Sequence, residues 1–211
     1  YSQQFPHHAN PLVVESYQTS TGVLLTRQQT IYEVTGDEVP HAYVALSVGE
    51  RYDLGDGTLL ATTSIRNSVD AFGNIVDTVT ELTDHFEGVT RSHQVLSSYT
   101  INESLWRIRQ LTEVRHQYSL DGLHDASLDK HHLVNFLSET GMPWRYIRAP
   151  GAGEGLELMR DVSYDGFGNP TSETLSGPGL AARTSATQYG SRGQFPSPII
   201  NALGHLTRQS W

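Results

Sequence analysis

Apolar and polar residues alternate along much of this chain, and this period of two predicts half-buried β-strands. Stretches rich in glycine, proline, asparagine and aspartate interrupt the alternation and predict turns. The chain is therefore expected to be all-β, with antiparallel strands joined by tight turns. Strands are predicted at residues 23–25, 31–34, 41–48, 58–65, 75–83, 94–99, 106–110, 113–118, 144–148, 156–163, 172–175, 183–189 and 206–210.

One turn sequence is written twice, as SVDAFGN at residues 68–74 and SYDGFGN at residues 163–169. Aspartate suits the first position of a type I turn, because its carboxylate accepts hydrogen bonds from backbone N–H groups inside the turn. Glycine suits the fourth position, where a left-handed backbone produces a bulged hairpin. Both copies predict a strand-turn-strand unit, and their similarity predicts a repeat architecture.

The segment 125–137 allows two interpretations. Its apolar residues fall roughly on one helical face, and Asp125 and Gly141 would cap a short helix. The strand pattern on either side favours a loop followed by a strand at residues 132–137. We expect the loop and strand, with the helix as the alternative.

Composition narrows the class of protein. Of the 211 residues 18% are charged and 19 are glycine, which is typical of strands and turns. The net charge of −9 argues against a nucleic-acid partner, whose affinity rests on basic residues. No apolar run is long enough to span a membrane. The absence of cysteine excludes disulfides and cysteine-ligated metals. Without an initiator methionine or the regions of a signal peptide, the chain is expected to be a piece of something longer.

Candidate chemistry is sparse. Adjacent histidines, at residues 7–8 and 131–132, would point to opposite faces of a strand and suit a shared metal poorly. Carboxylate pairs such as Asp53 and Asp56 lie in glycine-rich turns, where carboxylates mostly cap backbone N–H groups. Trp106, Trp144 and Trp211 are expected to fill an apolar face of the sheet, with a sugar-stacking platform as the alternative. We expect no catalytic residue, no cofactor and no metal ion.

Several motifs together resemble the Rhs/YD-repeat proteins, in particular the repeat shells of the B component of bacterial Tc insecticidal toxin complexes. The segment YDGFGN is similar to the family's Tyr-Asp-x-x-Gly-Asn core, and NALGH is similar to its N-x-L-G-H signature. Val69 replaces the tyrosine of the first repeat, and Gly190 stands where a later repeat would have aspartate. The stretches that carry the resemblance are 164–169, 176–184, 189, 192–196 and 201–205.

The resemblance implies a curved, twisted sheet of strand-turn-strand repeats, forming part of a β-shell or solenoid-like spiral. Residues 1–211 would be one wall segment, with poorly placed strands at 1–50, a first repeat region at 51–120, a decorated interval at 121–162 and the strongest repeats at 163–211. Tyr164 and Phe167 would pack a turn against the next repeat. The residues expected to carry the repeats are Asp70, Phe72, Gly73, Asn74, Tyr164, Asp165, Phe167, Gly168, Asn169, Asn201 and Gly204.

The function implied is structural and non-catalytic: part of a cocoon that encapsulates a toxic C-terminal polypeptide for delivery. Its partners would be the rest of the shell and the enclosed toxin, and its location secreted or on the bacterial cell surface. No stretch matches the autoproteolytic site of some members, so no catalytic residue is carried over. Open sheet edges predict self-association. The alternative function is a carbohydrate- or surface-binding β-module of a larger secreted protein.

Overall fold

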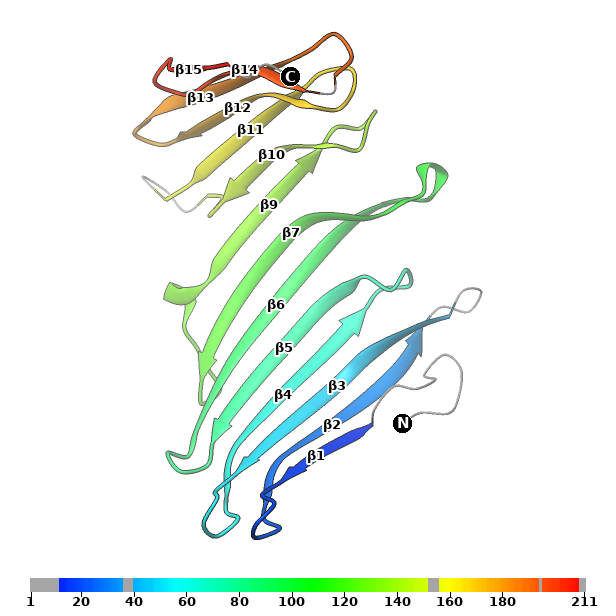
Figure 1. Ribbon diagram of the computed structural model, residues 1–211, viewed down its shortest axis with the longest axis vertical. Helices are drawn as coiled ribbons and strands as arrows, with labels where there is room; N and C mark the ends of the chain where they lie inside the picture. The colour runs from blue at the N-terminus through cyan, green and yellow to red at the C-terminus, as the bar shows by residue number, and fades with distance from the viewer. Residues whose placement is uncertain (1–11, 36–39, 152–155, 194, 209–211) are drawn as a thin grey trace. The chain divides into compact units, whose positions relative to one another are not determined.

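A computed structural model describes residues 12–35, 40–151, 156–193 and 195–208. It confirms the all-β antiparallel prediction: consecutive strands form hairpins and lie side by side (Figure 1). Two 3₁₀ turns, Glu103–Leu105 and Ala126–Leu128, are the helical elements of the described residues. The strands are β1 (Val13–Tyr17), β2 (Leu24–Thr35), β3 (His41–Tyr52), β4 (Leu59–Val69), β5 (Ile75–Asp84), β6 (Val89–Asn102), β7 (Arg107–Leu120), β8 (Leu123–His124), β9 (Lys130–Phe136), β10 (Pro143–Arg148), β11 (Leu158–Tyr164), β12 (Pro170–Gly177), β13 (Leu180–Tyr189), β14 (Pro196–Ile200) and β15 (Leu206–Thr207).

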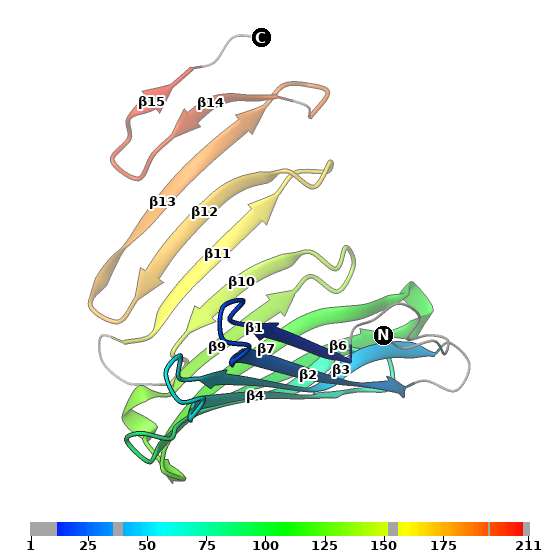
Figure 2. The same cartoon turned by 60° about the horizontal axis from the view of Figure 1, so that its bottom comes forward.

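The chain divides into two compact units that interleave along the sequence. Unit 1 comprises residues 1–99 and 115–129, and unit 2 comprises residues 100–114 and 130–211. In unit 1 the strands are ordered from β1 to β7, with β8 pairing with β7. In unit 2 the order is β7 and then β9 to β15, and Figure 2 shows β10 to β14 fanned out side by side. The long strands β6 and β7 each contribute residues to both units.

Irregularities in strand pairing occur beside the repeated turns. The register of β4 and β5 shifts between Ser68 and Val69, and that of β11 and β12 shifts between Ser163 and Tyr164. Such β-bulges increase the local right-handed twist of a strand pair and bend the strand that carries the extra residue. The pairing therefore supplies the curvature that a repeat sheet needs, at the same place in both copies.

Within the described residues, neither unit has a second layer that would create a hydrophobic core. Ala45 and Val162 are the buried apolar residues, and Asn74 is a buried polar one. Most other side chains stay partly exposed, because a single sheet leaves both faces open. The sheet must therefore be held by strand pairing, cross-strand contacts and turns.

The structure resolves the segment 125–137 in favour of the loop and strand. Residues 126–128 form a 3₁₀ turn capped by Asp125, and β9 pairs with β10. The helix alternative is wrong, because alternate residues of β9 face the same side and the strand finds a pairing partner beside it.

Other boundaries differ in detail from the prediction. The separate strands predicted at 23–25 and 31–34 are one strand, β2, and those at 106–110 and 113–118 are parts of β7. Trp106 lies outside β7, in a left-handed conformation at the end of a 3₁₀ turn, and is 74% exposed. The prediction that it fills an apolar face is therefore wrong. The last predicted strand is described only as β15, and residues 209–211 lie outside the described chain.

Candidate functional site

The first copy of the repeated turn is closed by the carboxylate of Asp70. The Asp70 N–H donates to the carbonyl of Asn74 at 2.9 Å, and the Gly73 N–H donates to the carbonyl of Asp70 at 3.1 Å. The Asp70 carboxylate accepts from the N–H groups of Phe72 and Asn74, both at 2.9 Å, and from the Asn74 amide at 2.8 Å. Gly73 has φ +77°, a conformation that suits glycine. Each residue written identically in the two copies after the serine thus has a place in this network.

The second copy reproduces the same network. The Asp165 carboxylate accepts from the N–H groups of Phe167 and Asn169, both at 2.9 Å, and from the Asn169 amide at 3.1 Å. Partial burial raises the pKa of Asp165, but hydrogen bonds from Asn169 and Phe167 outweigh it and hold the pKa below its usual value. Gly168 has φ +88°. The two turns lie in different units and have the same hydrogen-bond network.

A third turn, at residues 201–205, has the same backbone hydrogen-bond pattern but is formed by different residues. Asn201 Oδ1 accepts from the N–H groups of Leu203 and His205, both at 2.9 Å, and Gly204 has φ +79°. Asn201 replaces the aspartate, and His205 replaces the final asparagine. Sequence reasoning treated this segment as a separate signature. The signal that could have revealed the equivalence is the shared pattern of a carboxylate or amide residue, one further residue, then phenylalanine or leucine directly before glycine.

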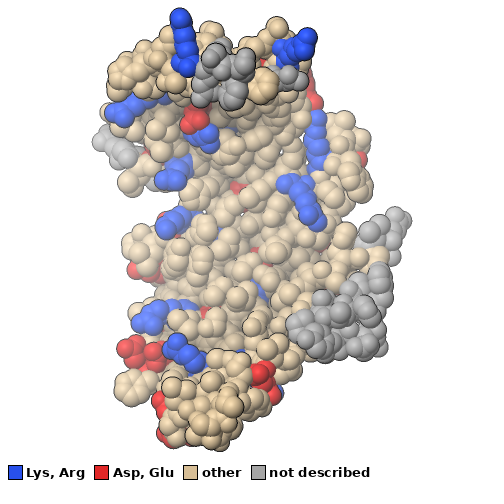
Figure 3. All heavy atoms as spheres, viewed as in Figure 1, with Lys and Arg blue, Asp and Glu red and all other residues tan. Residues whose placement is uncertain are grey.

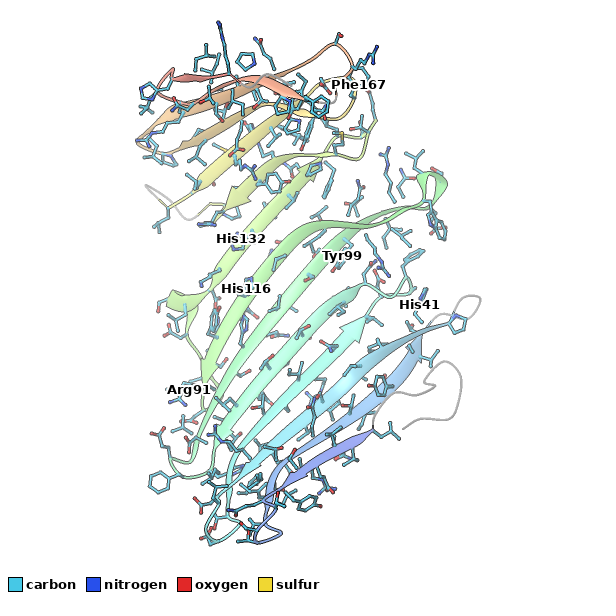
Figure 4. All side chains as sticks on the ribbon, in the orientation of Figure 1. His41, Arg91, Tyr99, His116, His132 and Phe167 are labelled. Atoms are coloured by element: carbon cyan, nitrogen blue, oxygen red, sulfur yellow. The ribbon has the colours of Figure 1, made fainter. Side chains whose placement is uncertain are left out.

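In unit 2 the second turn is stacked against the next turn at the same end of the strands. The Asn169 amide donates to the carbonyl of Gly193 at 2.8 Å. The Phe167 ring lies over Gly193 so closely that a Cβ there would be 2.6 Å from two ring carbons. Phe167, labelled in Figure 4, is 69% exposed, yet it covers the backbone of the neighbouring hairpin. Gly193 has φ +66° and lies in a turn that begins at Gly190.

The preceding turn of unit 2 joins the same stack from the other side. The Tyr164 hydroxyl donates to the carbonyl of Pro143 at 2.5 Å. A Cβ on Gly168 would be 3.5 Å from Met142, in the turn between β9 and β10. We call the turns 137–142, 165–169 and 190–193 the turn stack. The structure brings Tyr164, Phe167, Gly168 and Asn169 together there, whereas Asn201 and Gly204 lie in a turn at the opposite end of the strands.

Two arginine–carboxylate pairs connect neighbouring strands of unit 2. Arg145 on β10 binds Asp161 on β11 through two hydrogen bonds of 2.6 and 2.7 Å, and this contact holds the pKa of Asp161 below its usual value. Arg160 on β11 binds Glu173 on β12 at 2.7 Å. The Arg160 guanidinium also lies 5.2 Å from the centroid of the Tyr146 ring. The first pair connects β10 to β11, and the second connects β11 to β12.

An aromatic groove of about 620 Å³ opens beside the turn stack. Its wall includes Trp144, Tyr164 and Phe167, together with Met142 and the buried Val162. Trp144 is half-buried, and Trp211 lies outside the described residues. The aromatic residues are thus neither a closed core nor a fully exposed platform.

The carboxylates and histidines singled out in the sequence have structural partners. Asp53 accepts from the Gly55 N–H at 2.7 Å, and Asp125 accepts from the Ser127 N–H at 3.0 Å, so both cap turns. His131 Nε2 shares a hydrogen bond of 2.6 Å with Glu113 Oε1, and residues 7–8 lie outside the described chain. Among the residues that the structure describes, no three histidine or acidic side chains are grouped to hold a metal, and no helix is long and apolar enough to cross a membrane.

Comparison with known proteins adds evidence on the fold. No family model matches the sequence, and no curated protein matches it. The crystal structure of TcdB2-TccC3 without its hypervariable C-terminal region is similar over 94% of this chain, with a TM-score of 0.57 and 10% identity. The crystal structure of TcdB2-TccC3 gives 0.54 at 11% identity, and the Tc holotoxin pore of Photorhabdus luminescens gives 0.52 at 11%. This chain covers only 15–16% of those chains, so it has the fold of a small section of Tc toxin complex structures.

Proposed function

We propose that this chain is a structural, non-catalytic wall segment of a secreted, toxin-enclosing shell. In that role its hairpins would continue into further hairpins of a longer protein, and the enclosed cargo would be a toxic polypeptide. The observation that carries the proposal is the turn stack, in which one turn covers the backbone of the next through Phe167 and Asn169. Such nearest-neighbour contacts suit a sheet that grows by repetition.

Burial and fold likeness support the same role. In the described residues two apolar side chains are buried, which is little for a protein that must fold on its own. A wall segment would gain the missing contacts from neighbouring hairpins. The solved chains of similar fold are components of Tc toxin complexes, as their names state.

Limited proteolysis of the intact protein that contains this segment tests the proposal. An enclosed polypeptide should resist protease in the wild type and become cleavable when Gly193→Val disrupts the turn stack. Arg66→Gln, at an exposed position in unit 1, is the control and should leave the protection unchanged. Equal cleavage of the cargo in the wild type and the Gly193 variant would contradict the shell function.

The second candidate is a carbohydrate- or surface-binding module. The observation in its favour is the aromatic groove, where Trp144, Tyr164 and Phe167 line one opening. Aromatic rings stack on sugars when they are exposed in this way. A glycan array probed with wild type and Trp144→Ala decides the matter: hits that depend on Trp144 would support binding, and an array without hits would exclude it.

A further inference from the structure

The charge of the chain is divided unevenly between its two units. Unit 1 contains five basic and fifteen acidic residues, whereas unit 2 contains nine basic and eight acidic residues. The net charge of −9 therefore resides in unit 1, and unit 2 is close to neutral. Basic side chains are prominent over unit 2 in Figure 3. A local surface of unit 2 can thus be cationic although the chain as a whole is acidic.

Strand register builds such a surface across five strands of unit 2. Val134 pairs with Tyr146, Tyr146 with Arg160, Arg160 with Leu175, and Leu175 with Arg183. Directly paired residues of antiparallel strands point to the same face. We call these five residues, with Arg148 beside them on β10, the arginine row. Apolar and cationic side chains alternate along its second half.

All residues of the arginine row except Arg183 line an open groove of about 380 Å³. Its wall includes Val134, Tyr146, Arg148, Arg160 and Leu175. Strand β9 also contributes His132 to the lining, which is labelled in Figure 4. The groove is therefore lined by apolar residues together with Arg148 and Arg160.

Two of the three arginines of the arginine row, Arg148 and Arg183, have no carboxylate bound to them in the described residues. Glu173 is the acidic residue paired to this face, and its ion pair is with Arg160. Arg148 and Arg183 are exposed, and their guanidinium groups have no ion-pair partner within the described part of the chain. The positive charges of Arg148 and Arg183, which lie beside Leu158 and Leu175, therefore remain available to an acidic ligand.

We propose that the arginine row binds an extended, acidic polypeptide segment. Charge complementarity selects the acidic residues, and Tyr146 and Leu175 offer contacts to apolar side chains between them. This inference goes beyond the shell function and depends only on unit 2.

Fluorescence anisotropy with labelled peptides and the intact protein tests the proposal. The probes are four repeats of Glu-Ser-Leu, four of Gln-Ser-Leu and four of Lys-Ser-Leu. The glutamate peptide should bind most tightly, and raising the NaCl concentration from about 50 to about 300 mM should weaken its binding. The double variant Arg148→Gln/Arg183→Gln should bind it about five- to tenfold more weakly, which is the effect of losing two exposed ion pairs.

Matched controls separate the arginine row from general charge attraction. Arg66→Gln/Arg109→Gln removes two other exposed arginines and should leave the affinity for the glutamate peptide unchanged. Leu175→Ser should weaken binding without altering its salt dependence, because it removes an apolar contact. Equal binding of the lysine peptide, or an equal loss in the control double variant, would overturn the proposal. The proposal would also be overturned if a mass measurement showed that self-association of the protein accounts for the apparent binding.

Discussion

The contact between Phe167 and Gly193 predicts that two left-handed glycines differ in their tolerance of alanine. Any L-residue at Gly193, with φ +66°, is strained by about 1–2 kcal/mol. Its Cβ would also lie 2.6 Å from the Phe167 ring, and such overpacking costs about 1–3 kcal/mol more. Gly193→Ala should therefore destabilise the protein by about 2–5 kcal/mol.

Gly204 is the matched control. It has φ +79°, but an added Cβ would meet no atom within 4 Å. Gly204→Ala should therefore carry the backbone strain alone, about 1–2 kcal/mol. The difference between the two variants measures the contact between turns rather than the conformation of glycine.

A double-mutant cycle isolates the ring contact. In a Phe167→Ala background, Gly193→Ala should cost only the strain, so the two substitutions should couple by about 1–3 kcal/mol. Urea unfolding followed by tryptophan fluorescence gives the four free energies of unfolding. If Gly193→Ala costs the same with and without the Phe167 ring, the stacking of these turns is refuted.

Three further results are expected. Tyr164→Phe loses the hydrogen bond to the carbonyl of Pro143 and should destabilise by about 1 kcal/mol in the same urea assay; an unchanged midpoint would contradict this. The folded-state pKa of Asp165 is lowered, so its contribution to stability is present above the unfolded pKa of about 4 and is lost as pH falls through the folded pKa. Thermal unfolding of Asp165→Ala should accordingly depend less on pH below about 4 than that of wild type. The double variant Asn201→Asp/His205→Asn recreates the repeated turn with a charge-assisted hydrogen bond, and its melting temperature should be equal to or above that of wild type.

The local features of this protein could be predicted from the sequence, for a physical reason. Alternation of side chains between faces is a property of consecutive residues, and so is the capping of a turn by its own aspartate. Asp70 and Asp165 therefore appear in the sequence with the chemistry that they have in the structure. The loop and strand at residues 125–137 were also predictable from the flanking pattern, although not from the segment alone.

The equivalence of the third turn was harder to recognise. Asn201 and His205 are not identical to Asp165 and Asn169. Only the matching hydrogen bonds show that the two pairs of residues close their turns in the same way. The exposure of Trp106 was also unpredictable, since apolar residues are expected inside, and the described part of the chain offers no second layer to cover it.

The sequence by itself determined the all-β class and the hairpin turns. The tertiary structure decided which turns touch, and it placed Phe167 over Gly193, 26 residues away in the chain. It also aligned Tyr146, Arg160 and Leu175 into one row across three strands. The reason is that such neighbours are set by strand order and register, which arise from pairing between distant segments, whereas turn chemistry acts within a few residues.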